Sequence, residues 1–505
     1  MDVYIQKKKD IIKMDKKLSL YKEILTKDAK NIFILFSMLL ALPSLVYLIE
    51  NKSILYFTEW FTYFLEAPNN RLESVSNMIC FAFVFITLIV LYFCIIKNTK
   101  KLFRNKNDVF VFIILISIIF GAMIPFTTSD LFYYMGTGWV DAKYNENPYY
   151  VSVKDVKDSL DYEDEILDRT GYWQESKVVY GPVWVLFCKV LSALSFGNAT
   201  LGMYIYKLMA ILVHILSCLL IYKITNKEKF TLIYGINPFI LFEGLTNGHN
   251  DTYLILFILF AIYFLLKKKN IVATLIFLAL ATAVKYVAII LVPFLTLYYF
   301  RNKTPIKRIG YSLLCAIPFL IVFASCYLIY IRDTSMISVI ILQQEKYRES
   351  ILFLILTLFS KIGIERATID VVKKLFLFLF VLMYTFGVID VIFSRKITFT
   401  DIVRKCNKMI FVFLFFIITN LCPWYVMWLF PLIFWQKGKN FKLIIYIGFA
   451  YEFCILYNIA LYSESYEIGV WYIPTMILLV GIMWFIDKKC KQKEIGEKDG
   501  QVSCN

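Results

Sequence analysis

Residues 109–134 read VFVFIILISIIFGAMIPF-TTSDLFYY, an apolar run that gives way to a polar stretch. The apolar part, 109–126, is close to the roughly 20 residues that a helix needs to cross the hydrocarbon core of a bilayer. Asp130 comes where this run ends and a long polar loop begins. A carboxylate at the water-facing end of a membrane span ionises at little cost, while the neighbouring helices hold it in place. Asp130 is therefore a candidate for acid–base chemistry.

Runs of the same kind recur along the whole chain. Of its 505 residues, 60% are hydrophobic and 18% are aromatic, and the mean hydropathy is +0.66. A soluble domain does not need so much apolar surface, so the composition indicates a multi-pass membrane protein. No long polar stretch separates two apolar blocks, which predicts one all-α, polytopic transmembrane helical bundle over 31–486, with about fourteen spans. The apolar runs lie near 31–49, 77–96, 109–126, 202–224, 230–246, 251–267, 271–284, 286–300, 309–331, 374–394, 409–421, 425–435, 441–462 and 470–486.

The distribution of lysine and arginine predicts the orientation of this bundle. The net charge is +16, and the basic residues lie in short loops between the runs rather than on one soluble face. This pattern favours the positive-inside rule over a nucleic-acid-binding surface. The N-terminal arm 1–30, the loop 97–108 and the tail 487–505 are then cytoplasmic, and the loop 127–201 is extracytoplasmic. All later basic loops lie on the cytoplasmic side only if the run 183–196 does not cross the membrane. We therefore predict a re-entrant or interfacial helix there.

A second group of polar residues falls on the same outer face as Asp130. It is the turn Gly248-His249-Asn250-Asp251, which precedes an apolar run. Asn250 or Asp251 is suited to cap the helix that follows, which is a purely structural role. A histidine and a carboxylate close to a second carboxylate are, alternatively, what an active site needs.

Two cations on this face also have more than one interpretation. Lys285 interrupts the apolar stretch 279–292, where an unpaired ammonium is costly. It either extends to the outer surface or binds a phosphate group. Arg332 opens a further outer loop next to Asp333. A salt bridge or a membrane-edge anchor explains Arg332 as well as a phosphate contact does.

Aromatic residues accompany the charged groups. Tyr133 and Tyr134 come directly after Asp130, and Trp424 and Tyr425 lie in the last polar outer turn. Tryptophan and tyrosine at a membrane interface usually form an aromatic belt, but their ring planes also stack on sugars. Both interpretations stay open for these four residues.

Several kinds of site find no support in the sequence. The 11 cysteines are scattered and include no C-x-x-C pair, which argues against a zinc site and a disulfide framework. No Walker sequence occurs, and no G-x-G-x-x-G opens a helix, so no nucleotide-binding domain is indicated. No clear D-x-D pair is present in the first outer loop, so we assign no metal ligands and expect no cofactor, while a divalent metal stays open as an alternative. Two further carboxylates, Glu243 and Glu452, lie in apolar runs, and Glu452 should be paired or functional because it is in mid-span.

A set of short stretches follows in a fixed order over roughly 109–435. They are Ser129-Asp130 with Tyr133-Tyr134, Asn147-Pro148-Tyr149, Tyr180-Gly181-Pro182, Asn237-Pro238, Gly248-His249-Asn250-Asp251, Lys285 with Pro293, and Pro423-Trp424-Tyr425. In this order they resemble the integral-membrane glycosyltransferases of the GT-C fold. The similarity is greatest to the polyprenyl-phosphate-mannose-dependent alpha-mannosyltransferases of bacterial cell-envelope assembly. The set is more specific for the superfamily than for mannose.

The resemblance implies roles for individual residues. It implies that Asp130 is the general base, that His249 and Asp251 line the site, and that Lys285 lies near the donor phosphate. We add Arg332 as a second candidate for binding the donor phosphate. The candidates for binding substrate are Tyr133, Tyr134, His249, Asn250, Asp251, Trp424 and Tyr425.

The expected activity is transfer of a hexosyl residue, with mannose as the expected sugar, from a polyprenyl-phosphate sugar to an envelope glycan or glycolipid acceptor. Such a transfer needs a base for the acceptor hydroxyl and cations for the departing phosphate. It would take place at the extracytoplasmic face of the plasma (cytoplasmic) membrane, by a multi-pass protein with both termini in the cytoplasm. The partners are then the bilayer and the two substrates, with no nucleic acid.

Two other classes of function stay open at this point. A transporter or flippase of a lipid-linked saccharide would show broken helices and an internal repeat. A non-catalytic scaffold would not need charged residues gathered on one face.

Overall fold

The computed structural model describes residues 26–47, 71–125, 127–333, 350–394, 396–436, 439–460 and 473–489. Helix makes up 80% of the structure, and no β-strand occurs in the described stretches. The all-α prediction is therefore confirmed. Most of the arm 1–30 and of the tail 487–505 lies outside the described residues.

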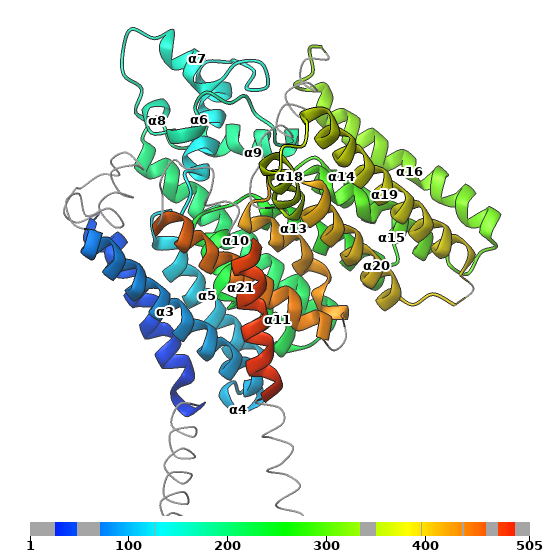
Figure 1. The fold of residues 1–505 in the computed structure, drawn as a ribbon, viewed down its shortest axis with the longest axis horizontal. Helices are drawn as coiled ribbons and strands as arrows, with labels where there is room; N and C mark the ends of the chain where they lie inside the picture. Colours follow the sequence, from blue (N-terminus) through cyan, green and yellow to red (C-terminus); the bar gives the residue numbers. More distant parts are fainter. Residues whose placement is uncertain are drawn as a thin grey trace, which may run out of the picture.

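The first part of the chain combines long helices with a group of shorter helices (Figure 1). The long helices and a short one between them are Thr26–Tyr47, α3 (Arg71–Lys97), α4 (Thr99–Leu102) and α5 (Lys106–Ala122). The group of shorter helices consists of α6 (Asp130–Lys143), α7 (Val153–Asp158), α8 (Glu165–Asp168), η1 (Gly171–Trp173) and α9 (Pro182–Ala193). In Figure 1, α6, α7 and α8 lie toward one end of the molecule and α4 lies at the other. The first described helix (dark blue) and the last one (red) each have one end near α4.

The middle of the chain contains helices that break inside their apolar runs. They are α10 (Ala199–Thr225), α11 (Glu228–Gly235), α12 (Pro238–Leu241), η2 (Phe242–Thr246), α13 (Asp251–Tyr263), η3 (Phe264–Lys268), α14 (Ile271–Thr282), η4 (Tyr286–Ile290) and α15 (Leu291–Tyr299). The segments Pro238–Thr246 and Asp251–Lys268 meet at an angle of 114°. The turn 247–250 lies at this bend, and Lys285 lies in the break between α14 and η4.

Local sequence explains where α12, the first helix of the bent pair, starts. The side-chain oxygen of Asn237 accepts hydrogen bonds from the backbone amides of Phe239 and Ile240, at 3.0 and 3.4 Å. Pro238 occupies the first turn, where a missing N–H costs nothing. The Asn237-Pro238 motif is therefore a helix start that fixes the approach to the bend.

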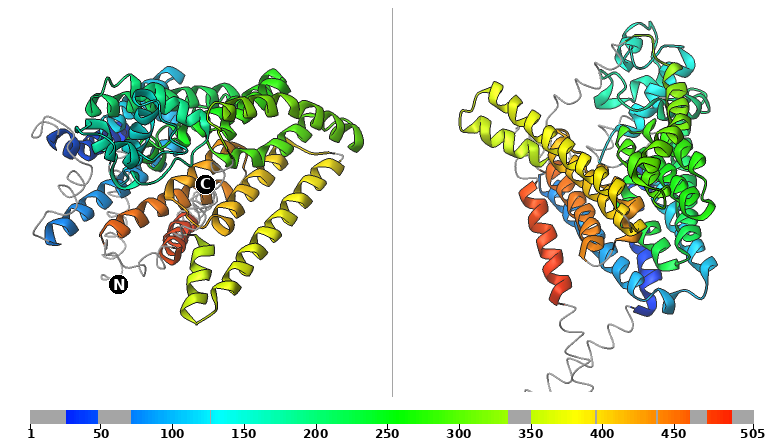
Figure 2. Two further views of the ribbon diagram at one scale, coloured as in Figure 1. Left: turned by 90° about the horizontal axis from the view of Figure 1, so that it is seen from above. Right: turned by 90° about the vertical axis from the view of Figure 1, so that its right-hand side faces the viewer.

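The last part of the chain completes the bundle. It contains α16 (Pro305–Leu328), α18 (Ile351–Lys361), α19 (Arg366–Phe393), α20 (Phe399–Val412), η5 (Phe413–Ile417), η6 (Pro423–Trp435), α21 (Lys439–Ala460) and a helix over 473–489. Figure 2 shows that α18 and α19 (yellow) stand out from the rest of the molecule. Val371, Phe378 and Phe386 on α19 are each more than half exposed, as suits side chains that face lipid.

The structure supports a membrane protein but not a particular number of spans. Five helices among the described residues are long and apolar enough to cross a bilayer, or six if the bent pair counts as one span. They are Thr26–Tyr47, Ile79–Lys97, Ala199–Thr225, Pro305–Leu328 and Asp370–Phe393. Several other predicted spans form shorter helices, such as α14 with 12 residues. The predicted total of about fourteen is therefore not confirmed.

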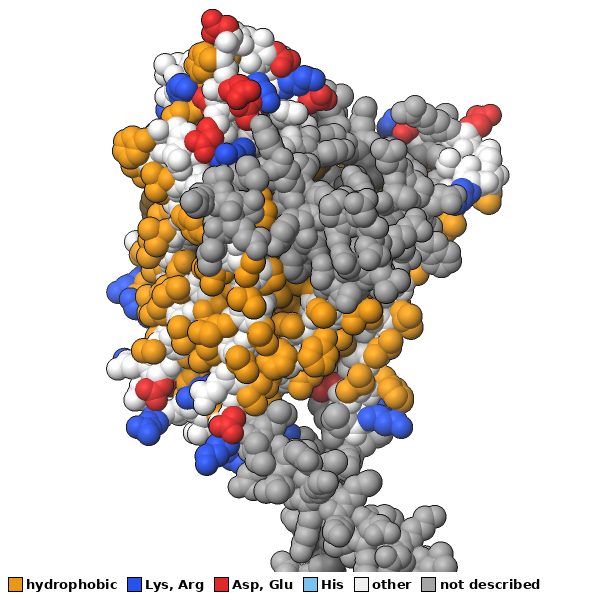
Figure 3. Space-filling model, turned by 90° about the vertical axis from the view of Figure 1, so that its left-hand side faces the viewer, with side chains coloured by type: hydrophobic (Ala, Val, Ile, Leu, Met, Phe, Trp, Pro, Cys, Tyr) orange, Lys and Arg blue, Asp and Glu red, His pale blue; other side chains and the backbone are white. Residues whose placement is uncertain are grey.

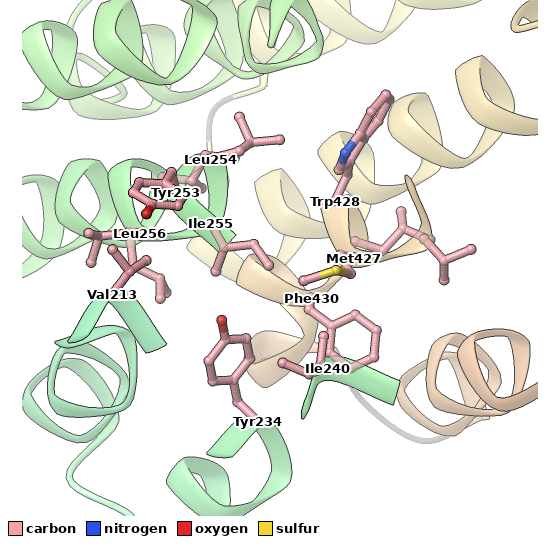
Figure 4. Close-up of a cluster of buried hydrophobic side chains, with 14 of the residues drawn as sticks. Val213, Tyr234, Ile240, Tyr253, Leu254, Ile255, Leu256, Met427, Trp428 and Phe430 are labelled. Carbon is pink, nitrogen blue, oxygen red and sulfur yellow. The ribbon is translucent and has the colours of Figure 1, made fainter. Parts of the chain in front are cut away.

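The distribution of side chains agrees with a bundle in lipid. On the face shown in Figure 3, hydrophobic side chains cover the middle of the molecule, and most of the charged ones lie toward its two ends. The interior is apolar as well. Figure 4 shows Ile240 of α12, Leu254 of α13, and Met427 and Phe430 of η6 in one cluster of buried side chains. This cluster fixes η6 against the two halves of the bent pair.

Candidate active site

Four segments bring the candidate residues together. They are the start of α6 with Asp130, the turn 247–250, the break at Lys285, and the first turns of η6. The carboxylate of Asp130 is 3.6 Å from Nδ1 of His249, and Asp251, which follows His249 by two residues, pairs with Lys285. Groups predicted separately from the sequence thus form two pairs, which the rings of Trp424 and Tyr425 connect.

Asp130 is buried, with only 4% of its surface exposed. The expectation that it faces water is therefore wrong. It begins α6, and its backbone amide donates to the hydroxyl of Thr128 at 3.1 Å. The hydroxyl of Tyr134, one turn later, lies 3.4 Å from the Asp130 carboxylate and donates to it. Burial raises the pKa of the Tyr134 hydroxyl well above its usual value, so this group stays a hydrogen-bond donor.

Lys285 is also buried, and it binds Asp251. Its ammonium lies 2.8 Å from each of the two carboxylate oxygens, which is a bidentate contact. Trp428 donates a hydrogen bond from its indole nitrogen to the same carboxylate. Lys285 therefore does not extend to the outer surface. Its ammonium lies over the rings of Tyr425, at 4.7 Å, and Trp428, at 5.5 Å, which adds cation–π stabilisation.

The aromatic residues of η6 pack on the charged groups. The ring of Trp424 stacks on His249, with centroids 3.8 Å apart and planes at 16°. Tyr425 stacks on Trp428 with centroids 4.5 Å apart. Because these rings contact site residues, a simple aromatic belt does not describe them.

The turn residues do not act as ordinary helix caps. Asn250 occupies the cap position of α13, but its side chain makes no capping hydrogen bond. Its oxygen and nitrogen are buried, and neither has a hydrogen-bond partner among the described residues. A buried amide without partners is costly, so Asn250 is available for a substrate hydroxyl. The Asp251 carboxylate is bound by Lys285 and Trp428 instead.

Glycine is required at position 248 of this turn. The φ of Gly248 is +73°, in the left-handed region, and a Cβ added there would lie 2.5 Å from Cδ1 of Leu131. Leu131 is the neighbour of Asp130, so this close approach sets the spacing between the turn and α6.

We expect Gly248→Ala to lower both stability and activity. The left-handed backbone costs a residue with a Cβ on the order of 1–2 kcal/mol, and the clash with Leu131 adds to this cost. Thermal unfolding of the purified variant measures the first effect, and its turnover measures the second. The matched control is Gly363→Ala, because Gly363 also has positive φ, +80°, but no atom within 4 Å of the added Cβ. Equal losses in the two variants would show that the contact with Leu131 is unimportant.

Two other predicted motifs support the site from outside it. The backbone amide of Gly181 donates to the carbonyl of Val284, at 3.1 Å, just before Lys285. A Cβ on Gly181 would lie 2.1 Å from the carbonyl oxygen of Ala283, so glycine permits this approach. Tyr149 donates its hydroxyl hydrogen to the carbonyl of Tyr180, at 2.7 Å, and so joins the two motifs.

The structure does not bring all predicted residues into this network. The Tyr133 hydroxyl donates to the carbonyl of Ser176, at 2.9 Å, which ties α6 to the loop between η1 and α9. Arg332 is exposed, and its guanidinium lies over the ring of Tyr150, 5.7 Å from the centroid. No described contact joins Arg332 to Asp130 or Lys285.

Sequence reasoning noted Glu243 only as a further carboxylate. In the structure its Oε2 atom lies 3.0 Å from Nε2 of His249 and accepts a hydrogen bond from Asn247 at 2.9 Å. The available signal was the spacing, since Glu243 precedes His249 by only six residues, and His249 lies in the turn 247–250. The sequence analysis also does not identify Lys207 as a residue near the site. Its ammonium is buried and donates to the carbonyls of Met123 and Leu245, at 2.7 and 3.0 Å, so it holds the bend in place.

No group of three or more metal-ligating side chains occurs in the part of the chain that the structure describes. The charged groups around Asp130 are instead paired with one another.

A helical bundle with apolar spans and a buried network of carboxylates, a histidine and a lysine has the features of an integral-membrane transferase. A family model described as "Alpha-(1->6)-mannopyranosyltransferase, N-terminal domain" matches residues 37–301, more than half of the chain. The chain therefore belongs to this family and is a GT-C-like mannosyltransferase. The matched region contains Asp130, His249, Asp251 and Lys285, whereas Trp424 and Tyr425 lie beyond it. No curated protein and no solved structure matches the chain at a significant level.

Proposed function

We propose that this mannosyltransferase takes its sugar from a polyprenyl-phosphate mannose and transfers it to a hydroxyl of an envelope glycan or glycolipid. Asp130 acts as the general base. The observation that carries the proposal is that two buried pairs, Asp130 with His249 and Asp251 with Lys285, lie on either side of the rings of Trp424 and Tyr425 in a mannosyltransferase chain. The alpha-(1->6) linkage in the family description is the linkage we adopt for the product.

The chemistry follows from the groups present. The acceptor oxygen attacks the anomeric carbon as its proton moves to Asp130, and the bond from that carbon to the phosphate oxygen breaks. The electron pair of this bond leaves with the polyprenyl phosphate. A single displacement inverts the anomeric carbon, so an alpha product requires a beta-linked donor.

Lys285 is the cation that we assign to the donor phosphate. Its ammonium has three hydrogens, and among the described residues it donates only to the two oxygens of Asp251. The third hydrogen can bind a phosphate oxygen, where it gains strength as negative charge develops on the leaving group. Arg332 is a second, exposed candidate that would reach the phosphate from the outer loop.

We assign a set of polar and aromatic residues to binding the sugar and the acceptor. They are Asn250, Tyr133, Tyr134, Trp424 and Tyr425. Asn250 offers an unpartnered amide, and the aromatic rings offer flat surfaces for a pyranose. Because Asp130, Asp251 and Lys285 are all buried, substrates reach them only after neighbouring side chains move.

A lipid-linked donor suits the proposed topology. In that topology both termini and the loop 97–108 are cytoplasmic, 127–201 is extracytoplasmic, and α9 does not cross the plasma membrane. The first and the last described helices each reach the end of the molecule at α4, away from α6 to α8, which supports this arrangement (Figure 1). Sugar nucleotides are made in the cytoplasm, on the side of the membrane opposite the proposed site. A polyprenyl carrier instead keeps its tail in the bilayer that surrounds the single bundle 31–486.

The test uses purified protein in liposomes that contain no nucleotide. We expect transfer of mannose from beta-linked polyprenyl-phosphate mannose to a short mannoside acceptor, and none from the alpha-linked anomer. Transfer from a nucleoside-diphosphate mannose, in liposomes without any polyprenyl carrier, would contradict both the donor and the outward-facing site. Transfer from both anomers would contradict the single displacement.

A flippase for a lipid-linked saccharide is the second candidate, because one observation favours it. The 114° bend between Pro238–Thr246 and Asp251–Lys268 is the kind of broken helix that transporters use at their binding sites. The same liposomes separate the two functions. A flippase would move labelled polyprenyl-phosphate mannose between leaflets in the absence of an acceptor, whereas a transferase would leave its distribution unchanged.

A further inference from the structure

The segments that carry Asp130 and His249 lie side by side and are tied together along their length. One segment comprises residues 120–125 and 127–131, which lead from α5 into α6, and the other is 245–249, which leads from η2 into the turn. We call their contact the α5–η2 seam. Contacts near the start of one segment go to the start of the other, and contacts near its end go to the end. They are Thr246 with Phe120, Asn247 with Thr127, Gly248 with Leu131, and His249 with Asp130.

Lys207 of α10 joins the two segments at the start of the seam. It is buried, with only 1% of its surface exposed. Its ammonium donates a hydrogen bond to the carbonyl of Met123 in the first segment, at 2.7 Å. It also donates to the carbonyls of Leu245, at 3.0 Å, and Thr246 in the second segment. One side chain from a third helix therefore determines how the two backbones lie against each other.

The same hydrogen bonds explain how a charged lysine is accommodated inside the bundle. Three carbonyls match the three hydrogens of an ammonium, and each partner of Lys207 among the described residues is such a carbonyl. These carbonyls lie at two helix ends, because α5 ends at Ala122 and the helix Pro238–Thr246 ends at Thr246. The C-terminal end of a helix carries partial negative charge, which stabilises a cation there.

We propose that Lys207 is a positioning residue whose charge holds the α5–η2 seam in register and thereby sets the distance between Asp130 and His249. The inference rests on the proposed function, since it concerns the group that takes the proton of the acceptor. Lys207 does not bind the donor phosphate in this account, because its three hydrogens are all bound to the backbone. Lys285 differs, since among the described residues it donates only to the two oxygens of Asp251.

The chain between these hydrogen bonds and the site residues is short. Thr246 precedes His249 by three residues, and Met123 precedes Asp130 by seven. A change in the spacing of Met123 and Thr246 therefore has little chain over which to relax. A displacement of about 1 Å at reacting groups can lower a rate on the order of 10²-fold, so a small change at the start of the seam is enough to affect the chemistry.

A pair of hydrogen bonds in the middle of the seam transmits such a change. The side-chain nitrogen of Asn247 donates to the hydroxyl of Thr127, at 2.8 Å, and the backbone amide of Thr127 donates to the side-chain oxygen of Asn247, at 3.3 Å. The two segments therefore move together here. The seam then reaches the Asp130 carboxylate, which lies 3.6 Å from Nδ1 of His249.

A purely structural role for Lys207 gives a different expectation. Its loss would then lower the amount of folded protein without changing the rate of each folded molecule. His214 offers a matched comparison, because it lies two turns beyond Lys207 on the same face of α10 and is also buried. Its Nε2 atom donates to the carbonyl of Gly235 on α11, at 3.1 Å, which is outside the seam.

The test compares kcat per folded molecule in two full-length variants, with thermal unfolding as the measure of stability. Lys207→Met keeps the length of the side chain and removes the charge and the three donors. Its kcat should fall on the order of 10²-fold, because the general base is displaced. The donor KM should change little, since the seam does not include the Lys285–Asp251 pair. His214→Leu should lower stability but keep kcat.

Thr246→Val is a milder change in the same seam. The Thr246 hydroxyl donates to the carbonyl of Phe120, at 3.0 Å, and valine keeps the shape without this hydrogen bond. Its kcat should fall less than that of Lys207→Met, again with little change in the donor KM, and it decides the question if Lys207→Met does not fold. Wild-type kcat in Thr246→Val or in folded Lys207→Met, or equal losses of kcat in Lys207→Met and His214→Leu, would overturn the proposal.

A cryo-EM structure of Lys207→Met, or of Thr246→Val if the first variant does not fold, tests the positioning independently of activity. The two segments should lie further apart at the start of the seam, and the separation of Asp130 and His249 should exceed that of the wild-type protein. An unchanged separation would overturn the proposal. If the wild-type protein transfers no mannose from any polyprenyl phosphate, the proposed function fails, while this separation still decides whether Lys207 positions the two residues.

Discussion

Asp130→Asn is expected to abolish mannosyl transfer while leaving the protein folded. The amide keeps the shape of the carboxylate and can still contact Tyr134 and His249, but it cannot take a proton from the acceptor. A general base contributes on the order of 10²–10⁴-fold to the rate, and the loss should be in kcat rather than in the donor KM. Single-turnover assays with radiolabelled polyprenyl-phosphate mannose measure it.

Asp141→Asn is a suitable control for this variant. Asp141 lies on the same helix and is also buried, but it binds Lys189 and Tyr330, at 2.7 and 2.6 Å, away from His249. We expect it to reduce stability without the same loss of kcat. Wild-type turnover by Asp130→Asn, or an equal loss of kcat in the two variants, would remove Asp130 from the mechanism.

The second large effect is expected at the pair Lys285–Asp251. Lys285→Met leaves a buried carboxylate without its cation, which typically costs about 3–5 kcal/mol of stability. Donor affinity should fall as well, because the phosphate loses its hydrogen-bond donor. Thermal unfolding and the donor KM measure the two effects separately.

The double variant Lys285→Met with Asp251→Leu distinguishes packing from phosphate binding. With both charges gone, apolar side chains fill the site, and most of the lost stability should return. Donor use should not return, because no ammonium is present. Arg332→Ala removes a lone exposed cation, and it should reduce donor affinity less than Lys285→Met does. A double variant that recovers both stability and donor use would place the phosphate elsewhere.

The apolar pattern predicts well which segments are helical, but it does not predict which helices cross the membrane. The run 202–224 corresponds to α10, Ala199–Thr225, and the charge at Lys285 marks a real break in an apolar stretch. The pattern could not show that 130–143 is helical, because α6 mixes polar, aromatic and glycine residues whose burial depends on its packing against α9. Nor could it decide how many short helices cross a bilayer, since that depends on tertiary arrangement.

The candidate site was predictable as a list of residues but not as a network. The sequence indicates four of the site residues one by one, because polar groups in apolar surroundings need partners. These are Asp130, His249, Asp251 and Lys285. The sequence does not indicate their pairing, because Lys285 and Asp251 are 34 residues apart and Trp428 binds Asp251 across 177 residues. The importance of Glu243 cannot be predicted for the same reason, since it comes from contacts with His249 and Asn247.

The most direct test of the central claim is a cryo-EM structure with a non-transferable phosphonate analogue of beta-linked polyprenyl-phosphate mannose. The account predicts that the phosphonate lies within hydrogen-bonding distance of Lys285 and that the anomeric carbon lies on the Asp130 side of the turn 247–250. The prenyl chain should leave the bundle into the bilayer. A mannosyl group bound away from Asp130, with the Lys285–Asp251 pair out of reach of the phosphonate, would contradict it.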